Sequence, residues 1–391
     1  MASLPPIVHV AGSGNIGNQM FKAMTALTVH SQVEGSRLAN INLPEWNLVY
    51  PPIPHGPGHT ERHPPNRIMD IDVASIIRRM RSGELHRVDI ENYAQHLNNL
   101  RTPDFYRPIF PDTAHTPELP LDCLLINIRG GEVLDARHPD YVLLPLEYYA
   151  EIIAETGLRP VFMGQLEPNP YTNRLRARFP GAGFIPSMGQ MADFALIRRA
   201  RNIIVSVSTF SWLAAWLSHA ERIFLPVNGF YSAAQHPEID LLPLDDARYH
   251  FTQFPVNYAV PVADHLPVHA ALNGTWRNIT PAELRIIRAR VSTSAPNAAS
   301  YLEAFDETAY RTIYPDIDAA IRNGALSSGW DHYQHTGIIE GRTPFHFDRI
   351  HYAAQHIDAA IAVAQGHYAD LLHHYLEVGR PAGYTANPHD G

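Results

Sequence analysis

The sequence predicts an α/β fold with two Rossmann-like lobes followed by an α-helical repeat region, and three observations support this prediction. Residues 120–226 alternate apolar strands with helical stretches in the doubly wound manner. A glycine-rich turn follows an N-terminal strand and opens a helix. A pattern near the C-terminus recurs at a constant offset of 42 residues. We therefore expect a first lobe, a second lobe, a linker and two helical repeats, covering residues 1–118, 119–262, 263–300 and 301–391.

The second lobe has the clearest pattern. Its continuous apolar runs are typical of parallel strands covered on both faces. The expected strands cover residues 123–128, 160–164, 183–186, 202–206 and 222–226. The expected helices cover residues 146–156, 171–179, 191–200 and 209–219. Open parallel sheets bind ligands beyond the carboxyl ends of their strands, so we expect a ligand site at that edge.

Hydroxyl side chains crowd the end of the strand 202–206. Ser206, Ser208, Thr209 and Ser211 lie where the unpaired N–H groups and the positive end of a helix dipole would face an anion. This pattern favours a phosphate-binding turn. Serine and threonine are also ordinary N-caps, so a plain helix cap is the alternative.

A second strand-to-helix turn lies near the N-terminus, between the expected strand 6–10 and a helix from Asn18 onward. Its spacing, Gly-x-Gly-x-x-Gly over residues 12–17, matches the dinucleotide-binding fingerprint. The acidic residue that would complete the fingerprint is not evident. Glu34 precedes the next expected strand, and Glu45 follows a proline. An NAD-dependent oxidoreductase is therefore an alternative supported by these glycines alone.

A third segment brings Asn127, Arg129 and Glu132 to the carboxyl end of an apolar strand. The guanidinium of an arginine binds two oxygen atoms at once and keeps its proton, so Arg129 suits a phosphate clamp. The alternative is a surface salt bridge from Arg129 to Asp135 or Asp140.

Together, the three segments resemble the α-1,2-fucosyltransferases. Residues 14–21 read Gly-Asn-Ile-Gly-Asn-Gln-Met-Phe, where that family has Gly-Gly-Leu-Gly-Asn-Gln-Met-Phe. Residues 127–132 stand in place of its His-x-Arg-Arg-Gly-Asp motif, and residues 208–217 are close to its Ser-Thr-Phe-Ser-Trp-Trp-Ala-Ala-Trp-Leu. The similarity covers roughly residues 6–260. It implies a GT-B fold, with a cleft between two Rossmann-like lobes, and a GDP-linked sugar as donor, with no metal or other cofactor.

The resemblance also implies roles for matching residues. Arg129 would stabilise the β-phosphate of the leaving GDP, and Asn18 would lie near the transferred sugar and the acceptor. Ser208 and Thr209 would hold the pyrophosphate. Asp193 occupies the place from which the related α-1,6 enzymes bind guanine through a carboxylate; a helix cap is the alternative.

Further positions belong to the predicted nucleotide-sugar-binding site, and some of the motif residues differ from those of the family. By position we add Gly17, Asn127 and Ser206 to the nucleotide-sugar-binding residues. Asn127 replaces the family histidine, Gly130 its second arginine and Glu132 its aspartate, while Asn15 replaces a glycine. Either another cation from the first lobe compensates for the lost arginine, or the donor differs from GDP-fucose.

The family reaction inverts the anomeric carbon by direct displacement. The resemblance therefore implies that Arg129 neutralises the charge growing on the diphosphate, helped by the N–H groups after Ser206. Glu132 is our first candidate for the general base and Asp135 the second; the alternative for both is a solvated loop charge.

The composition, net charge and cysteine count argue against several classes of function and location. With 45% hydrophobic and 18% charged residues the chain has an ordinary globular composition, and a net charge of −9 argues against nucleic acid as partner. Cys123 is the single cysteine, so we expect no disulfide and a cytoplasmic location. We expect no signal peptide, and the sequence shows no apolar run long enough to span a membrane. His59 and His63 are four residues apart, but the prolines that follow oppose a helix, so we expect no metal site.

The first lobe and the linker give weaker signals. Residues 73–81 and 90–100 have helical periodicity, residues 38–42 are expected to form a strand, and one helix is expected at 281–290. The proline-, glycine- and histidine-rich segment 51–66 could contact the acceptor.

The C-terminal repeat pairs Phe305-Asp306, Tyr310 and His332-Tyr333 with the same residues 42 positions later. Each unit predicts two short helices separated by a glycine turn, and we expect its His-Tyr pairs to be core and turn residues. It resembles repeats appended to bacterial surface-glycan enzymes. Two units hide little surface between themselves, which favours packing on the lobes, oligomerisation, or docking to a protein or a membrane surface.

The sequence therefore predicts a glycosyltransferase that acts on a GDP-sugar and a glycan acceptor in bacterial surface polysaccharide synthesis. A nucleotide- or glycan-binding homologue without activity is the first alternative, and the oxidoreductase is the second.

Overall fold

The computed structural model describes residues 5–65, 68–293, 298–338 and 340–388 and divides into two compact units. Unit 1 contains Met1–Arg137, Leu146–Pro226 and Glu238–Phe251. Unit 2 contains His138–Pro145, Val227–Pro237 and Thr252–Gly391. This division differs from the expected domains, because both predicted lobes fall largely within unit 1. The repeats share unit 2 with the linker and with parts of the predicted second lobe.

Unit 1 begins with a small parallel sheet in the order β2-β1-β6-β5. Its strands are β1 (Ile7–Val10), β2 (Arg37–Ala39), β5 (Thr60–His63) and β6 (Arg87–Ile90). An antiparallel pair is formed by β3 (Ile41–Leu43) and β4 (Leu48–Tyr50). The helices of this part are α1 (Ile16–His30), α2 (Val73–Arg81) and α3 (Pro103–Tyr106).

Two expectations for this first sheet need correction. The strand expected at 38–42 is divided at Asn40, whose φ of 58° is left-handed, and the Asn40 side chain donates to the Val10 carbonyl at 2.7 Å. The helix expected at 90–100 is wrong. Asn92 donates to the Ile68 carbonyl and accepts from the N–H of Ala94 two residues later, and Asn99 bonds to the backbone of Met69 and Ile71. These bonds offer the chain an alternative to helical hydrogen bonds.

The second sheet has seven strands in the order β13-β12-β11-β10-β7-β8-β9. These strands are β7 (Cys123–Arg129), β8 (Arg159–Gln165), β9 (Gly183–Pro186), β10 (Asn202–Ile204), β11 (Arg222–Val227), β12 (Tyr249–Gln253) and β13 (Arg277–Ile279). From β7 outward this is the doubly wound order of a Rossmann-like sheet. The pairs from β9 through β8, β7 and β10 to β11 are parallel.

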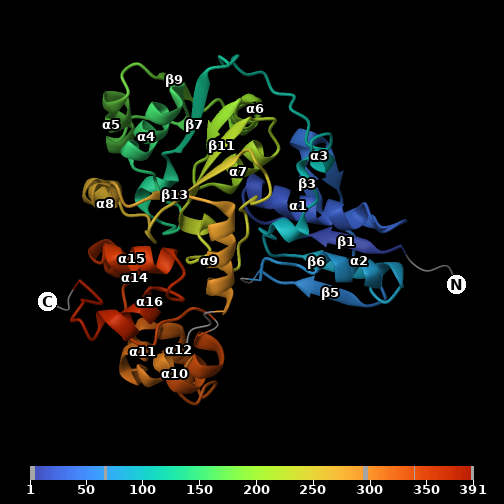
Figure 1. Ribbon diagram of the computed structural model, residues 1–391. Helices are drawn as coiled ribbons and strands as arrows, with labels where there is room; N and C mark the ends of the chain where they lie inside the picture. Colours follow the sequence, from blue (N-terminus) through green and yellow to red (C-terminus); the bar gives the residue numbers. More distant parts are fainter. Residues whose placement is uncertain (1–4, 66–67, 294–297, 339, 389–391) are drawn as a thin grey trace. The chain divides into compact units, whose positions relative to one another are not determined.

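Four helices connect these strands, and all four were predicted to within three residues at either end. They are α4 (Leu146–Thr156), α5 (Pro170–Arg178), α6 (Gln190–Arg199) and α7 (Thr209–Trp216). Figure 1 shows α4 and α5 on one side of the sheet and α6 and α7 on the other. Central strand residues such as Leu124, Ile126 and Ile203 are completely buried between these layers, as expected for a parallel sheet.

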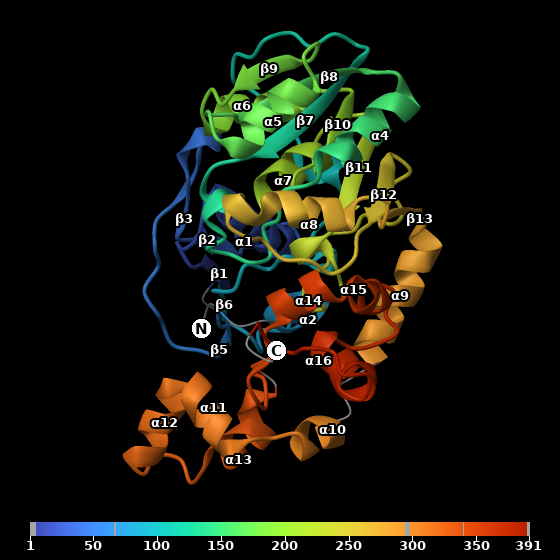
Figure 2. The ribbon, with the colours of Figure 1, turned by 90° about the vertical axis from the view of Figure 1, so that its left-hand side faces the viewer.

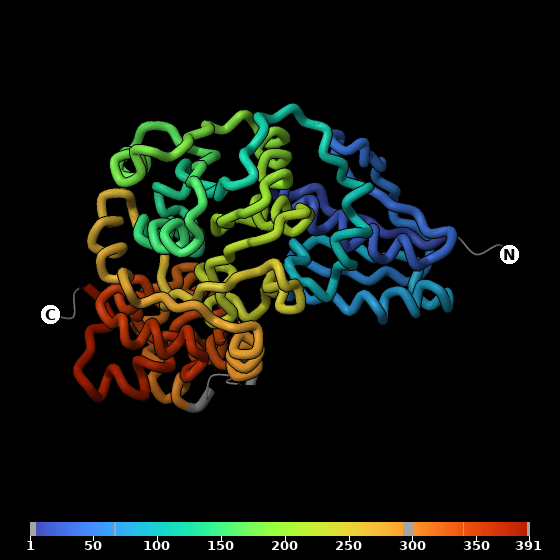
Figure 3. The backbone as a smooth tube through the Cα atoms, turned by 45° about the horizontal axis from the view of Figure 1, so that its top comes forward, coloured from blue at the N-terminus to red at the C-terminus, as the bar shows by residue number. Residues whose placement is uncertain are grey.

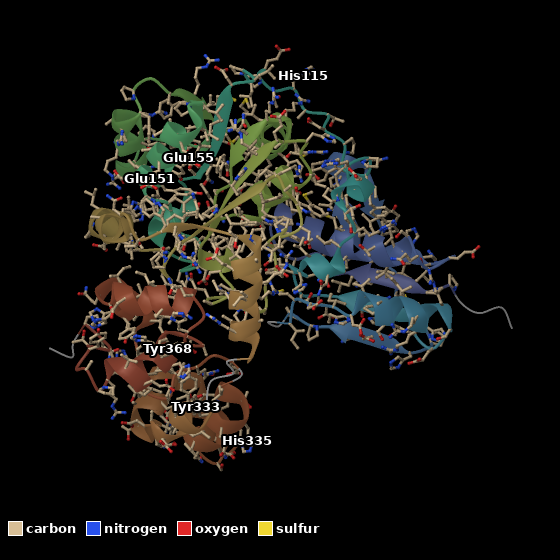
Figure 4. The ribbon with its side chains drawn as sticks, viewed as in Figure 1. His115, Glu151, Glu155, Tyr333, His335 and Tyr368 are labelled. Carbon is tan, nitrogen blue, oxygen red and sulfur yellow. The ribbon has the colours of Figure 1, made fainter. Side chains whose placement is uncertain are left out.

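An extended connection leads from α3 to β7, and the backbone trace in Figure 3 shows its course. His115, labelled in Figure 4, lies on this segment. Asp112 anchors the segment to α6 through an ion pair with Arg199, in which the Nε–Oδ2 distance is 2.6 Å.

Unit 2 holds the remaining helices. They are α8 (His265–Leu272), α9 (Pro281–Thr293), α10 (Ala298–Glu303), α11 (Glu307–Ile313), α12 (Pro315–Arg322), α13 (Gly329–His332), α14 (Arg349–Gln355), α15 (Ile357–Ala364) and α16 (Leu371–His374). Figure 2 shows α11 to α13 and α14 to α16 as two successive groups. Each group has three short helices and ends in a π-helical turn, rather than the two helices expected.

The same buried contact occurs in both groups. The Tyr310 hydroxyl lies 3.0 Å from Nδ1 of His332, and the Tyr352 hydroxyl lies 2.9 Å from Nδ1 of His374. Tyr333, labelled in Figure 4, is fully buried. These residues have the core positions that the sequence predicts for them.

None of the helices in the described part of the chain combines the length and the hydrophobicity needed to cross a bilayer.

Candidate functional site at the carboxyl ends of β7 and β10

The predicted site residues follow two strands that lie next to each other. β10 pairs with β7 in parallel, with Ile203 opposite Leu125 and Ile204 opposite Ile126. Both strands therefore deliver the residues that follow to one edge of the sheet. The chain leaves β7 toward β8 on one side and β10 toward β11 on the other, so this edge is the topological switch point where doubly wound sheets bind ligands.

A buried hydrogen-bond network joins the two strand ends. The Ser206 hydroxyl donates to Oδ1 of Asn127 at 2.6 Å and lies 2.9 Å from the Ser211 hydroxyl. The amide of Asn127 contacts the sulfur of Met163 on β8 at 3.0 Å. Asn127 and Ser206 thus fix the shape of the edge through bonds to each other.

Arg129 forms its ion pair with Glu132. Oε1 of Glu132 lies 3.0 Å from Nε and 2.6 Å from the second terminal nitrogen of Arg129, and Gln165 donates to the other carboxylate oxygen at 3.2 Å. Of the two aspartates named from the sequence, Asp135 pairs with Arg137 and Asp140 with His236. Glu132 begins the short 3-10 turn Glu132–Asp135, three residues after Arg129, the last residue of β7.

The ion pair with Arg129 affects whether Glu132 can act as a general base. Burial acts to raise the pKa of Glu132, but hydrogen bonds from Arg129 and its positive charge outweigh burial, and the pKa lies below the ordinary value. A carboxylate with a lowered pKa is a weak proton acceptor. Asp135 is exposed and bound to a neighbouring arginine, so it gains no support as a base.

The beginning of α7 is where the sequence predicts a phosphate-binding turn. Ser208 is the N-cap residue with extended backbone, and its side chain does not cap the first-turn N–H groups. The helix begins at Thr209, whose hydroxyl would lie 2.9 Å from a β-carbon at Gly17. Such a β-carbon would also lie 3.2 Å from the backbone nitrogen of Phe210, so a larger residue at position 17 would require α1 and the start of α7 to move apart slightly.

Asn18 and Lys22 lie one turn apart on α1. Oδ1 of Asn18 accepts a hydrogen bond from Gln95 at 2.9 Å. The Lys22 ammonium donates to the carbonyls of Ala11 and Ser13 at 2.5 and 2.6 Å. Lys22 thereby fixes the backbone of the glycine-rich turn through these two bonds. The sequence did not predict this role for Lys22.

Asp193 lies in the first turn of α6 and is 8% exposed. Its carboxylate accepts hydrogen bonds from the Ser187 hydroxyl at 2.5 Å and from the backbone N–H of Met188 at 2.9 Å. These bonds fix the segment that precedes the helix, whereas the N-cap residue is Gly189, so Asp193 is not the helix cap that the sequence offered as its alternative. A carboxylate accepts up to about four hydrogen bonds, so these two leave acceptor capacity.

A second charged cluster was missed from the sequence. Asp89 on β6 is 2% exposed and pairs with Arg87 at 2.6 Å, while His9 on the neighbouring strand β1 lies 3.4 Å away. Burial and the charge of Arg87 lower the pKa of His9. His9 and Asp89 are register partners, so this contact appears only once the β1–β6 pairing is known.

Within the described ranges no three His, Cys, Asp or Glu side chains gather as a metal ion would require. His59 and His63 do not share a helix face, because residues 60–63 form the strand β5. A comparison of the chain with protein-family models finds no match, and a comparison with curated proteins finds none either.

Proposed function

We propose that the protein is an inverting glycosyltransferase of GT-B architecture that transfers fucose or a related sugar from a GDP-sugar to a glycan acceptor. The observation that carries the proposal is the hydrogen bond between Asn127 and Ser206. It joins the two strand ends at the switch point and places Arg129 and the start of α7 at one edge. A diphosphate held there would meet both a guanidinium and helix N–H groups.

In this proposal each part has a separate role. Arg129 and the first-turn amides of α7 neutralise the charge that develops on the leaving diphosphate. Asn18, which Gln95 holds at the start of α1, orients the transferred sugar. Asp193 accepts from guanine with the capacity that its two internal bonds leave. The chemistry as proposed requires no metal.

The proposal also includes a cytoplasmic location and a docking role for the C-terminal region. Cys123 is a buried free thiol, which suits a reducing cytoplasm. We assign the region after residue 301 to docking, in keeping with enzymes of bacterial surface polysaccharide synthesis. Its His-Tyr residues are engaged in the core and are not offered to a substrate.

One observation favours a second candidate, a nucleotide-binding homologue without activity. The charge of Arg129 is already neutralised by Glu132, so a diphosphate must compete with this carboxylate. The oxidoreductase has less support. β2 ends at Ala39 and is followed by Asn40, where a dinucleotide-binding fold carries an acidic residue for the ribose.

The test compares two arginines on the same pair of strands. Arg129 ends β7, whereas Arg159 begins β8 at the opposite edge and forms an equivalent ion pair with Asp122 at 2.7 Å. Thermal-shift screening with GDP, UDP, ADP, CMP and NAD identifies the nucleotide, since a ligand that binds the native state raises its stability.

We expect GDP to stabilise the wild type and the Arg159→Ala variant alike, and sugar transfer to be lost in Arg129→Ala. Stabilisation by NAD instead of GDP would reject the transferase. GDP binding without donor hydrolysis or transfer would select the inactive homologue.

A further inference from the structure

A cavity with an arginine-rich lining lies at the opposite edge of the β7–β11 sheet from the candidate site. It has a volume of about 770 Å³ and is formed by the α3–β7 connection, the ends of α6 and α7 and the starts of β10 and β11. We call it the arginine cavity. Its charged lining residues are Arg107, Arg198, Arg199, Arg201, His219, Asp112 and Glu221.

Some of these charged side chains form ion pairs or hydrogen bonds within the protein. Arg199 binds Asp112 and the Thr116 hydroxyl, and Arg201 binds Glu221 at 2.5 Å. Arg107 donates to the carbonyls of Leu217 and Ser218, which stabilises the C-terminal end of α7, and it also pairs with Asp104.

Arg198 differs from these arginines. Within the described residues its guanidinium makes one hydrogen bond, to the carbonyl of Phe110, and pairs with no carboxylate. Burial lowers the pKa of Arg198, and the charges of Arg107 and Arg199 lower it further, although Asp112 acts against them. A guanidinium in this position has N–H groups and positive charge available to a ligand.

The pKa of His219 indicates the sign of the electrostatic potential inside the cavity. The charge of Arg107 is the largest cause of its lowered pKa, followed by burial and by the charges of Arg198 and Arg248. The negative charge of Asp104 opposes this effect but does not cancel it. The potential at His219 is therefore positive in a chain whose net charge is −9.

We propose that the arginine cavity binds a small phosphate-bearing anion, with Arg198 as its main ligand and Arg107 and His219 beside it. A volume of this size accommodates a ligand of metabolite dimensions. Leu121, Pro108 and Leu217 add apolar surface to the lining, which the organic part of a phosphate ester would contact. The site lies beyond the amino ends of the strands, so it does not depend on the function proposed for the carboxyl edge.

The experiment follows the imidazole resonance of His219 by NMR while inorganic pyrophosphate is added; the resonance is assigned with His219→Gln. A bound anion offsets the arginine charges, so the His219 pKa should rise toward its ordinary value. Arg198→Ala should weaken the binding at least about tenfold. Arg178→Ala is the matched control, because Arg178 also ends a helix, α5, yet lies outside the cavity.

Three outcomes would overturn the proposal. They are an unchanged His219 titration in the wild type at saturating pyrophosphate, equal weakening by Arg178→Ala, or binding to phosphatidylglycerol vesicles with no response to pyrophosphate. The wild-type titration remains decisive even if Arg198→Ala fails to fold. Arg129→Ala should leave the His219 response intact, which separates this site from pyrophosphate bound at the carboxyl edge.

Discussion

Lys22 offers the sharpest test of the site's electrostatics, because it is the only lysine in the sequence. Its side chain is completely buried, and its ammonium contacts the Ala11 and Ser13 carbonyls and, at 3.2 Å, the Ser13 hydroxyl. Burial lowers the pKa of Lys22 from 10.5 to about 8. One pKa unit corresponds to about 1.4 kcal/mol, so burial costs the charged form about 3 kcal/mol. The three oxygen acceptors recover part of this cost, which makes the figure an upper bound.

The pKa of this ammonium can be measured directly. Protein labelled with [ε-¹³C]lysine gives a single lysine signal, whose shift follows the protonation of Lys22. We expect a midpoint near 8 in the native protein and near 10.5 in denaturant. A native midpoint equal to that of the unfolded chain would refute the reasoning, because it would mean that the carbonyls compensate burial fully.

The same shift predicts how stability depends on pH. The pKa is lower in the folded than in the unfolded state, so between about 8 and 10.5 the unfolded chain binds more protons. Stability therefore rises with pH across this window, by at most about 3 kcal/mol. Other groups titrate there too, so Lys22→Met, which keeps a similar chain without the charge, is the reference in urea denaturation. The difference between the two proteins should change across the window; a constant difference would contradict the prediction.

Four further substitutions test other parts of the structure. Glu132→Gln removes the charge that neutralises Arg129, so GDP should bind about tenfold more tightly in calorimetry; weaker binding would show that Glu132 helps to hold the ligand. Ser206→Ala removes the buried hydroxyl between the two strand ends and should lower the free energy of unfolding by about 1–2 kcal/mol in urea denaturation. Tyr310→Phe and Tyr352→Phe each remove a buried hydroxyl-imidazole bond and should cost about 1–2 kcal/mol each; a cost in only one would show that the two groups are not equivalent.

The sheet around β7 could be predicted because its strands are covered on both faces. Such strands are continuous apolar runs bounded by polar turns, and a run such as Cys123–Arg129 has few alternative interpretations. The helix Leu146–Thr156 was predicted with its observed bounds for a similar reason, since its apolar face has a clear period. Local sequence was enough for these elements.

The segment 90–100 could not be predicted in this way. Its apolar spacing fits a helix, but Asn99 bonds to the backbone of Met69 and Ile71, far away in the sequence. The contact between His9 and Asp89 likewise depends on which strands become neighbours. Periodicity contains no information about such long-range partners, so the sequence placed Arg129 at the site but not its bond to Glu132.

The motif that residues 127–132 resemble has a second arginine where this chain has Gly130, and the structure offers a reason for the glycine. β7 pairs with β8 as far as Arg129 opposite Gln165. A β-carbon at Gly130 would lie 2.7 Å from the backbone carbonyl oxygen of Gln165, closer than real β-carbons come. An arginine therefore does not fit here unless the end of β8 moves. In the proposed site, Lys22 would not replace the charge of this arginine, because its ammonium is bonded to the carbonyls of Ala11 and Ser13. In the proposed transferase, a donor diphosphate would therefore have to compete with Glu132 for the charge of Arg129.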